Sequence, residues 1–330
     1  MRNSRMGRRG LLGAGVGLCS ARAAAGQPQG GFPDRPIRWI VPAPPGGGFD
    51  LVARLLSAGL SPRLGQPIVI DNRPGAGTGI GAEAAAKSPP DGHTVASADN
   101  GTLVFNPVLY RRLAYDPERD FRLVGTTARF HLVLAVRAGS PIGTAADLIA
   151  RARAAREPTD YGSPGAGIPH HLAMERIARE SGARLSPVHY RGLAAVMTDM
   201  LAGTIDVAVL DLFAARDHLL AGRFRPLAAC SAARLAALPE VPTVREALGL
   251  AAFEAYAWQA LVVPRATPEP PVLRLRAALL AVLDDSAVAG RMRDQGLDPM
   301  PGGEAEFAGL LRREREVWVP LIRSLGIALD

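Results

Sequence analysis

Hydrophobic and polar residues alternate along this chain in a rhythm of short strands and longer helices. Strand-like runs occupy residues 37–41, 67–72 and 93–98, and each is followed by a helical pattern, at 51–62, 80–88 and 102–112. Parallel strands need a crossover connection, which is usually a helix. This order therefore predicts an α/β protein with a mostly parallel sheet and helices on both faces.

A second series of the same kind begins after a predicted strand at 131–137. Thr144 is predicted to cap a helix over 144–155, with Asp147 completing an aspartate variant of the capping box. Further strands are predicted at 159–163, 185–190, 205–211 and 224–230, and further helices at 170–182, 193–202 and 212–221. The chain ends with an apolar segment at 256–264 and helical patterns at 270–285 and near 304–325. We predict a discontinuous first lobe of residues 26–130 and 255–330, a second lobe of 131–254, and a ligand cleft between them.

Two strand-to-helix loops have the composition of an anion site. The first, "VPAPPGGGFD" (41–50), contains three prolines and three glycines but no lysine or arginine. Prolines stop the strand from continuing, glycines allow another group to approach the backbone, and Asp50 is predicted to be the N-cap of the next helix. Such a loop presents free amides and a helix N-terminus to an anion. The alternative is a tight turn that binds nothing.

The second loop, "YGSPGAGIPHH" (161–171), follows a predicted strand and opens a predicted helix in the same way. It too lacks lysine and arginine. Each helix end stabilises an anion by roughly 0.3–1 kcal/mol, and a charge-assisted hydrogen bond adds about 1.5–3 kcal/mol. Two such loops that face each other would suit a molecule with anionic ends, such as a dicarboxylate.

The net charge of +7 over 330 residues changes this picture little. Residues 1–25 hold five arginines and no acidic residue, so the rest of the chain carries only +2. Lys87 is the single lysine, and no stripe of arginines interleaved with aromatic residues is present. We therefore predict that nucleic acid is not a partner.

Residues 1–25 have the pattern of a cleavable signal peptide for export to the periplasm. A charged start is followed by a short apolar stretch at 10–18 and by an Ala23-Ala24-Ala25 cleavage site. The pair Arg8-Arg9, followed by Gly-Leu-Leu, resembles a twin-arginine signal, although general export stays an alternative. The cleaved chain keeps one cysteine, Cys230, which we predict to be a small buried side chain rather than a catalytic thiol.

Enzyme signatures are incomplete in this sequence. The first loop lacks the Gly-Lys-Ser/Thr of a phosphate-binding loop, and "GTGIGA" (77–82) is separated from its strand, unlike a dinucleotide-binding turn. Ser163 lacks the flanking glycine of a nucleophile elbow because Tyr161 stands there, and Pro164 has no amide for an oxyanion hole. We predict no enzyme activity, no cofactor and no metal site, with an exported hydrolase using Ser163 as an alternative.

Seven runs, which are distributed from residue 36 to residue 268, resemble the Bug family of periplasmic solute-binding proteins, the receptors of tripartite tricarboxylate transporters. The runs are "PIRWIVPAPPGGGFDLVAR" (36–54), "LGQPIVIDNRPGAGTGIGAEAAAKSPPDGHT" (64–94), "NPVLYRRLAYDPERDF" (106–121), "YGSPGAGIPHHLAMERI" (161–177), "VHYRGLAAVMTDMLAGTIDV" (188–207), "FRPLAACSAARLAALPEVPTVREALG" (224–249) and "WQALVVPRATP" (258–268). The resemblance implies a two-lobed type II periplasmic-binding-protein fold that closes on a small carboxylate ligand. It also implies membrane transporter components as partners; we predict a monomer, and a ligand sensor that feeds a signalling partner is an alternative.

The resemblance also implies which residues bind the ligand. In the first loop they are Pro45, Gly46, Gly47 and Asp50, and in the second they are Ser163, Gly165, Gly167 and His171. Segments 99–102 and 190–192 and Asp211 are weaker candidates. This chain departs from the family at Ala43, Phe49, Ile168-Pro169 and His189. Phe49 and Ile168 would make the pocket drier and favour a ligand with an aromatic or apolar body.

Overall fold

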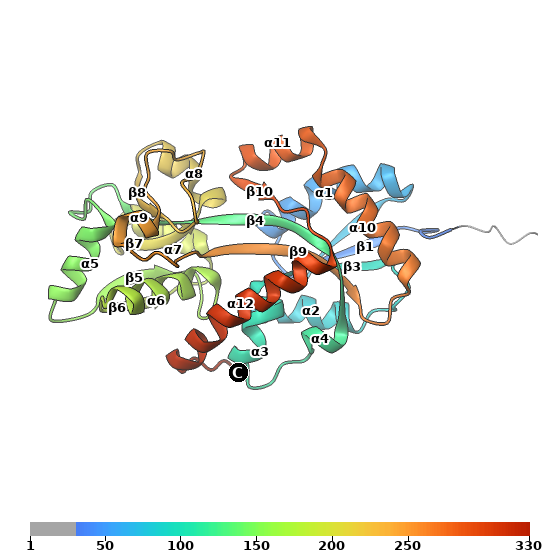
Figure 1. The fold of residues 1–330 in the computed structure, drawn as a ribbon, viewed down its shortest axis with the longest axis horizontal. Coiled ribbons are helices and arrows are strands. Elements are labelled where there is room, and N and C mark those ends of the chain that lie inside the picture. Colours follow the sequence, from blue (N-terminus) through green and yellow to red (C-terminus); the bar gives the residue numbers. More distant parts are fainter. Residues whose placement is uncertain (1–30) are drawn as a thin grey trace, which may run out of the picture. The chain divides into compact units, whose positions relative to one another are not determined.

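The strand order places two long strands, β4 and β9, at the centre of the sheet (Figure 1). This computed structural model describes residues 31–330, in which ten strands form one sheet with the order β2-β1-β3-β9-β4-β7-β5-β6, while β8 and β10 also pair with β4. The strands are β1 (Ile37–Val41), β2 (Ile68–Asn72), β3 (Thr94–Asp99), β4 (Phe121–Arg137), β5 (Thr159–Ser163), β6 (Leu185–His189), β7 (Val207–Asp211), β8 (Phe224–Ala229), β9 (Tyr256–Pro264) and β10 (Leu297–Pro299).

The pairing directions make the carboxyl ends of two strand sets face each other. Strand β9 is antiparallel to both β3 and β4, so β3 and its parallel neighbours β1 and β2 run in the direction of β4. Strand β7 is antiparallel to β4 and carries β5 and β6 parallel to itself. Asp99, which ends β3, aligns through Gln259 with Ala128, whereas Asp211, which ends β7, aligns with Leu132. Four residues of β4, or about 13 Å, therefore separate the two edges.

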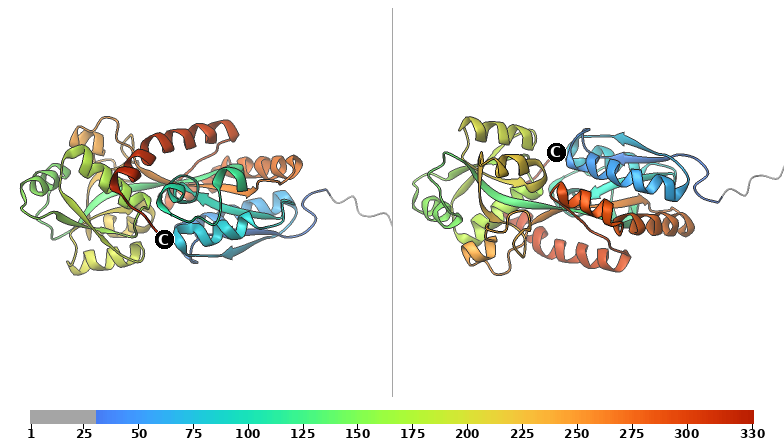
Figure 2. Two further views of the ribbon diagram at one scale, coloured as in Figure 1. Left: turned by 90° about the horizontal axis from the view of Figure 1, so that it is seen from below. Right: turned by 90° about the horizontal axis from the view of Figure 1, so that it is seen from above.

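Helices cover both faces of the sheet (Figure 2). The helices are α1 (Gly48–Leu64), α2 (Gly79–Ala86), α3 (Asn106–Leu109), α4 (Pro117–Asp120), α5 (Ala145–Ala154), α6 (Pro169–Ser181), α7 (Leu193–Ala202), α8 (Leu212–Leu220), α9 (Val244–Leu248), α10 (Glu269–Leu283), α11 (Ser286–Asp294) and α12 (Glu304–Leu325), with short η1 (Ala76–Thr78) and the π-helical η2 (Gly101–Phe105). One core lies under α1, α10 and α11, and another lies under α7 and α8. The largest core is continuous from Trp258 and α12 to Leu172 of α6, so it joins the two strand sets.

The structure confirms the predicted alternation of strands and helices and corrects some of its details. Strand β4 begins at Phe121 rather than at 131, because two β-bulges and a mixed sequence hide its first ten residues. The capping box of Thr144 is present, and Cys230 is fully buried. The prediction of Asp50 as an N-cap is wrong, since the helix begins at Gly48 with Gly47 as its cap.

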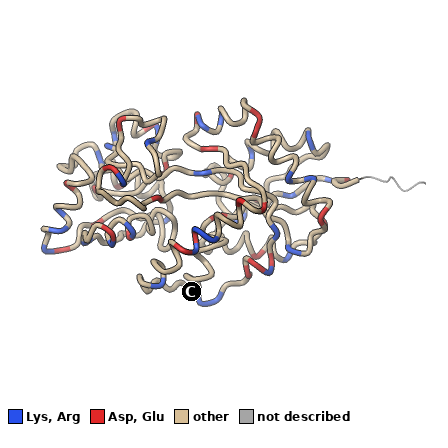
Figure 3. Tube along the Cα trace, viewed as in Figure 1, with Lys and Arg blue, Asp and Glu red and all other residues tan. Residues whose placement is uncertain are grey.

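Residues 32–330 form a single compact unit, so the predicted lobe boundaries stay predictions. The predicted signal peptide, residues 1–25, lies outside the described residues. Figure 3 shows that basic and acidic residues are mixed along the trace of the described part of the chain. No helix within residues 31–330 combines the length and the apolar character that a membrane span requires.

Candidate functional site

The first loop, residues 42–47 between β1 and α1, is held in shape by Asp50. The Asp50 carboxylate accepts hydrogen bonds from the Gly46 amide at 3.0 Å, from Arg54 Nε at 2.8 Å and from Asn72 Nδ2 at 3.0 Å. The hydrogen bond from Arg54 is the main reason that the pKa of Asp50 is lowered to about 2. Gly46 has a φ of +84°, a conformation that favours glycine. Asp50 therefore shapes the loop and occupies the Gly46 amide, while Pro45 lies exposed beside it.

The N-terminus of α1 lies directly over the middle of β4. A Cβ atom placed on Gly48 would come within 2.6 Å of Phe130 Cε1, and the Phe49 ring stacks on Phe130 with centroids 6.3 Å apart. In the first turn of a helix the amides have no partner inside the helix. The amides of Gly48 and Phe49 are thus presented between the two strand edges, next to an aromatic surface.

The second loop, residues 164–168 between β5 and α6, satisfies several of its own polar groups. The Ser163 hydroxyl donates to the Gly165 carbonyl at 2.8 Å, and the Gly167 amide donates to His171 Nδ1 at 2.9 Å. Gly167 adopts a φ of +72°, and a Cβ there would come within 2.4 Å of Leu109 Cδ1. Leu109 belongs to α3, which follows the carboxyl end of β3. The second loop therefore lies against α3, a helix that follows the first strand set along the chain.

His171 is a buried anchor of this loop. Its ring stacks on that of Tyr161 and meets the His189 ring edge to face, with the two imidazole centroids 4.9 Å apart. Only 3% of His171 is exposed. Burial, helped by the nearby His189, lowers the pKa of His171 to about 4. Because Nδ1 accepts the Gly167 amide, a neutral ring is required for this arrangement.

The carboxyl end of β3 carries a buried polar network. Asp99 accepts hydrogen bonds from the amide and the hydroxyl of Thr102 at 2.8 and 2.6 Å, and burial raises the pKa of Asp99. The Thr102 hydroxyl is also 2.8 Å from that of Thr78. Thr78 ends a run in which Gly75, Ala76 and Gly77 also have positive φ. Strained backbone of this kind occurs at binding sites, and here Thr78 lies against Thr102, just after the carboxyl end of β3.

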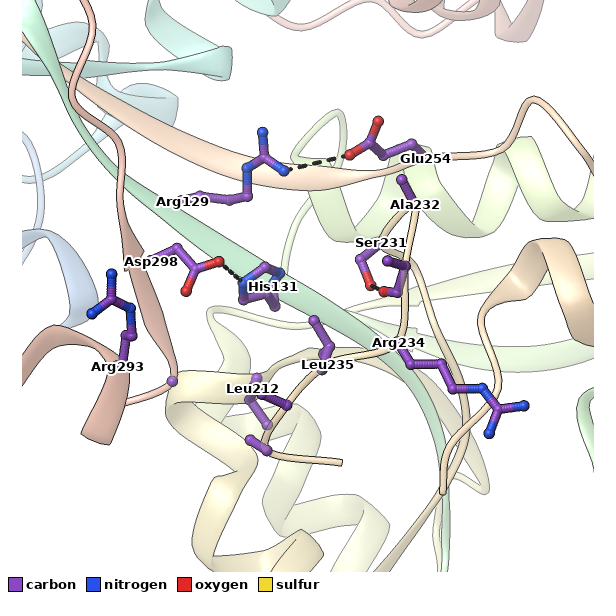
Figure 4. A pocket seen from close by; sticks show the side chains of 14 residues that line it. Arg129, His131, Leu212, Ser231, Ala232, Arg234, Leu235, Glu254, Arg293 and Asp298 are labelled. Atoms are coloured by element: carbon purple, nitrogen blue, oxygen red, sulfur yellow. Dashed lines mark hydrogen bonds and ion pairs between the residues drawn. The ribbon is translucent and has the colours of Figure 1, made fainter. Parts of the chain in front are cut away.

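A separate cavity of about 330 Å³ lies on the other face of β4 (Figure 4). Arg129 and His131 line it, and these side chains alternate with Phe130 along the strand. Across it His131 Nε2 and Asp298 Oδ2 lie 2.8 Å apart, and Arg129 lies 3.5 Å from Glu254. None of the predicted ligand-binding residues lines this cavity.

The geometry brings the predicted residues to two facing edges but assigns them different tasks. Gly47 caps α1, whereas Asp50, Ser163 and His171 mainly bond to their own loops. Phe130 was not among the predicted site residues, because it lies in the part of β4 that the hydrophobic pattern did not reveal. Alternation of Phe130 with the polar Arg129 and His131 was the available signal.

An α/β fold whose strand edges face each other across two crossing strands is that of the two-lobed periplasmic solute-binding proteins. The family model described as tripartite tricarboxylate transporter family receptor matches residues 52–327, and this chain belongs to that family. The predicted family and fold class are thereby confirmed.

Relatives extend over nearly the whole chain. A protein of Pseudomonas sp. (strain P51), described as a UPF0065 protein in the tcbD-tcbE intergenic region, is 36% identical over 318 residues, which are 96% of this chain and 94% of the relative. The solved structure of R. palustris Rpa4515 with adipate has a TM-score of 0.83 and 33% identity, and covers 90% of this chain and 99% of its own. MatC (Rpa3494) from Rhodopseudomonas palustris with bound malate has a TM-score of 0.78 and 31% identity, with coverages of 88% and 100%. The family and these neighbours are solute-binding proteins.

Proposed function

We propose that this protein is a periplasmic receptor that binds a small carboxylate between the first and second loops and presents it to the membrane components of a tripartite tricarboxylate transporter. It acts as an exported monomer, after removal of residues 1–25, and catalyses no reaction. Membership of the receptor family and the neighbours with adipate and malate support this proposal.

The position of the α1 N-terminus is the observation on which the proposal rests. Its first amides stand over Phe130, between the carboxyl edges of two strand sets that point at each other. The first loop has no lysine or arginine, so backbone dipoles supply the attraction for an anion. Each charge-assisted hydrogen bond contributes about 1.5–3 kcal/mol to such binding.

The environment of Ser163 argues against hydrolysis. A serine nucleophile must pass its proton to a nearby base. Here the Ser163 hydroxyl is fully buried and donates instead to the Gly165 carbonyl. We therefore expect that esters and amides incubated with the purified protein stay intact and that Ser163→Ala leaves this result unchanged.

A thermal-shift screen of the mature protein against mono-, di- and tricarboxylates tests the proposed binding. A ligand at a hundredfold excess over its Kd should stabilise the protein by about 2.7 kcal/mol. A screen in which every acid leaves the melting temperature unchanged would contradict the proposal.

Two substitutions test the role of the loops. Gly47→Val and Gly165→Val should abolish the ligand-induced shift without unfolding the protein, because the nearest atom to a new Cβ is 3.7 Å away at both positions. Gly290→Val, on α11 with no atom within 4 Å, is the matched control and should bind normally. Full affinity in both loop variants would refute a site made of loop backbone.

A further inference from the structure

Asp211 occupies a helix N-cap but does not cap the helix. It ends β7 and precedes α8, a position at which an aspartate ordinarily accepts a hydrogen bond from an amide of the first turn. The Asp211 side chain makes no such bond, and it is 20% exposed. Its carboxylate is therefore directed elsewhere.

The carboxylate meets the imidazole of His170 from the neighbouring α6. His170 Nε2 lies 3.2 Å from Asp211 Oδ2, which is ion-pair distance, but the two groups do not form a hydrogen bond. Neither ring nitrogen of His170 has a hydrogen-bond partner within residues 31–330. His170 is only 8% exposed. Leaving a buried polar group unsatisfied costs about 1–3 kcal/mol, so such groups normally have a partner. The free ring nitrogens thus point to a group that completes the site.

The pair lies opposite the N-terminus of α1. Asp211 aligns directly with Leu132, and directly aligned residues of paired strands project from the same face. Phe130, two residues away on that face of β4, packs against Gly48 at the start of α1. A separation of two residues along a strand is about 7 Å. A small molecule that contacts the amides of α1 can therefore also reach Asp211.

The chemistry of Asp211 and His170 restricts that molecule. Within the described residues, His170 is the one side chain that lies at ion-pair distance from Asp211, and no arginine or lysine offsets the carboxylate. A ligand with carboxylates alone would place like charges together, which is unfavourable at short range. A ligand with an N–H or O–H donor would satisfy the carboxylate, while the imidazole can accept or donate a further hydrogen bond.

We propose that the Asp211–His170 pair recognises a hydrogen-bond donor on the ligand, so that the receptor selects carboxylates that carry an ammonium or hydroxyl group over the unsubstituted acids. This inference rests on the proposed function. The first two amides of α1 hold a carboxylate, and the pair across the cleft holds the donor. Discrimination arises because an unsubstituted acid leaves the buried His170 imidazole and the Asp211 carboxylate beside it unsatisfied.

Calorimetric titration with two matched series tests this selection: succinate, malate and aspartate, and glutarate, 2-hydroxyglutarate and glutamate. At least one substituted acid should bind tenfold or more tightly than its unsubstituted parent. A preference for the amino acids identifies ammonium as the donor, and a preference for the hydroxy acids identifies hydroxyl. Equal or tighter binding of succinate and glutarate would overturn the inference while leaving the carboxylate receptor intact. If none of the six acids binds while another carboxylate of the thermal-shift screen does, this inference fails and the proposed function stands; if no carboxylate binds in either experiment, both fail.

Substitution of the pair supplies a second measure. Asp211→Asn and His170→Asn should reduce the preference for the substituted acid at least tenfold and change the affinity for the unsubstituted acid much less. Asp217→Asn, on the exposed side of the same helix α8, is the matched control and should retain the preference. An unchanged preference in both site variants would overturn the inference. If a variant does not fold, the ligand series on the unaltered protein still decides the question.

Discussion

The buried imidazole of His171 should make the stability of this protein depend on pH in a defined window. Its ordinary pKa of 6.5 falls to about 4 in the folded state, so the unfolded chain binds a proton more readily than the folded protein. The stability that the neutral His171 imidazole contributes is therefore fully present above about pH 6.5 and is lost as the pH falls toward 4. Linkage applied to these two values predicts a loss of about 2 kcal/mol between pH 7.5 and pH 5.

His171→Asn isolates this contribution. An asparagine oxygen can replace Nδ1 as the acceptor for the Gly167 amide, but it does not titrate. Urea denaturation, followed by tryptophan fluorescence at pH 7.5 and pH 5, measures the free energy of unfolding of both proteins. The unaltered protein should lose about 2 kcal/mol more than the variant over this interval.

The exposed His189 provides the control, because burial is the larger cause of the shift and His189 the smaller. His189→Asn should therefore keep most of the pH dependence. If His171→Asn loses stability between pH 7.5 and pH 5 as steeply as the unaltered protein, the imidazole is not the titrating group and the reasoning fails.

Three further predictions concern residues around the loops and the core. Asp50→Asn should lower the free energy of unfolding at pH 7 by at most about 2 kcal/mol, and by less in practice because solvent screens the half-exposed Arg54. The difference between variant and unaltered protein should vanish as the pH falls from about 3.8 to about 2, which urea titrations across that range test. Gly167→Ala should destabilise the protein by about 1–2 kcal/mol because of the positive φ at this position, and by more because the new Cβ would clash with Leu109. Leu109→Ala combined with Gly167→Ala should relieve that clash, and a double-mutant cycle that shows no coupling would exclude the contact. Glu314→Gln should raise the melting temperature at pH 8, because burial raises the pKa of this carboxyl and its ionised form costs stability as the pH rises; a lower melting temperature would contradict this.

The type and order of most elements could be predicted from the amino-acid sequence alone. The periods of its hydrophobic pattern match strands and helices, and Gly and Pro at 42–48 and 164–169 mark the loops that end β1 and β5. These signals are local, since they depend on φ preferences and on which face of a single element is buried. The runs shared with the receptor family extended this local information to the fold class and the family.

How those elements come together as a site depends on strand pairing and packing across the whole fold. The register of β4 with β7 and β9 sets Asp211 and Gln259 on the face of Phe130, and the extension of β4 back to Phe121 was not visible in the sequence. The hydrogen bond that Asp50 accepts from the Gly46 amide, in place of the predicted helix cap, was likewise not visible in the sequence. Strand pairing joins residues far apart in the chain, and its register depends on the packing of the whole sheet. For that reason the approach of His170 to Asp211 could not be read from the spacing of residues along the sequence.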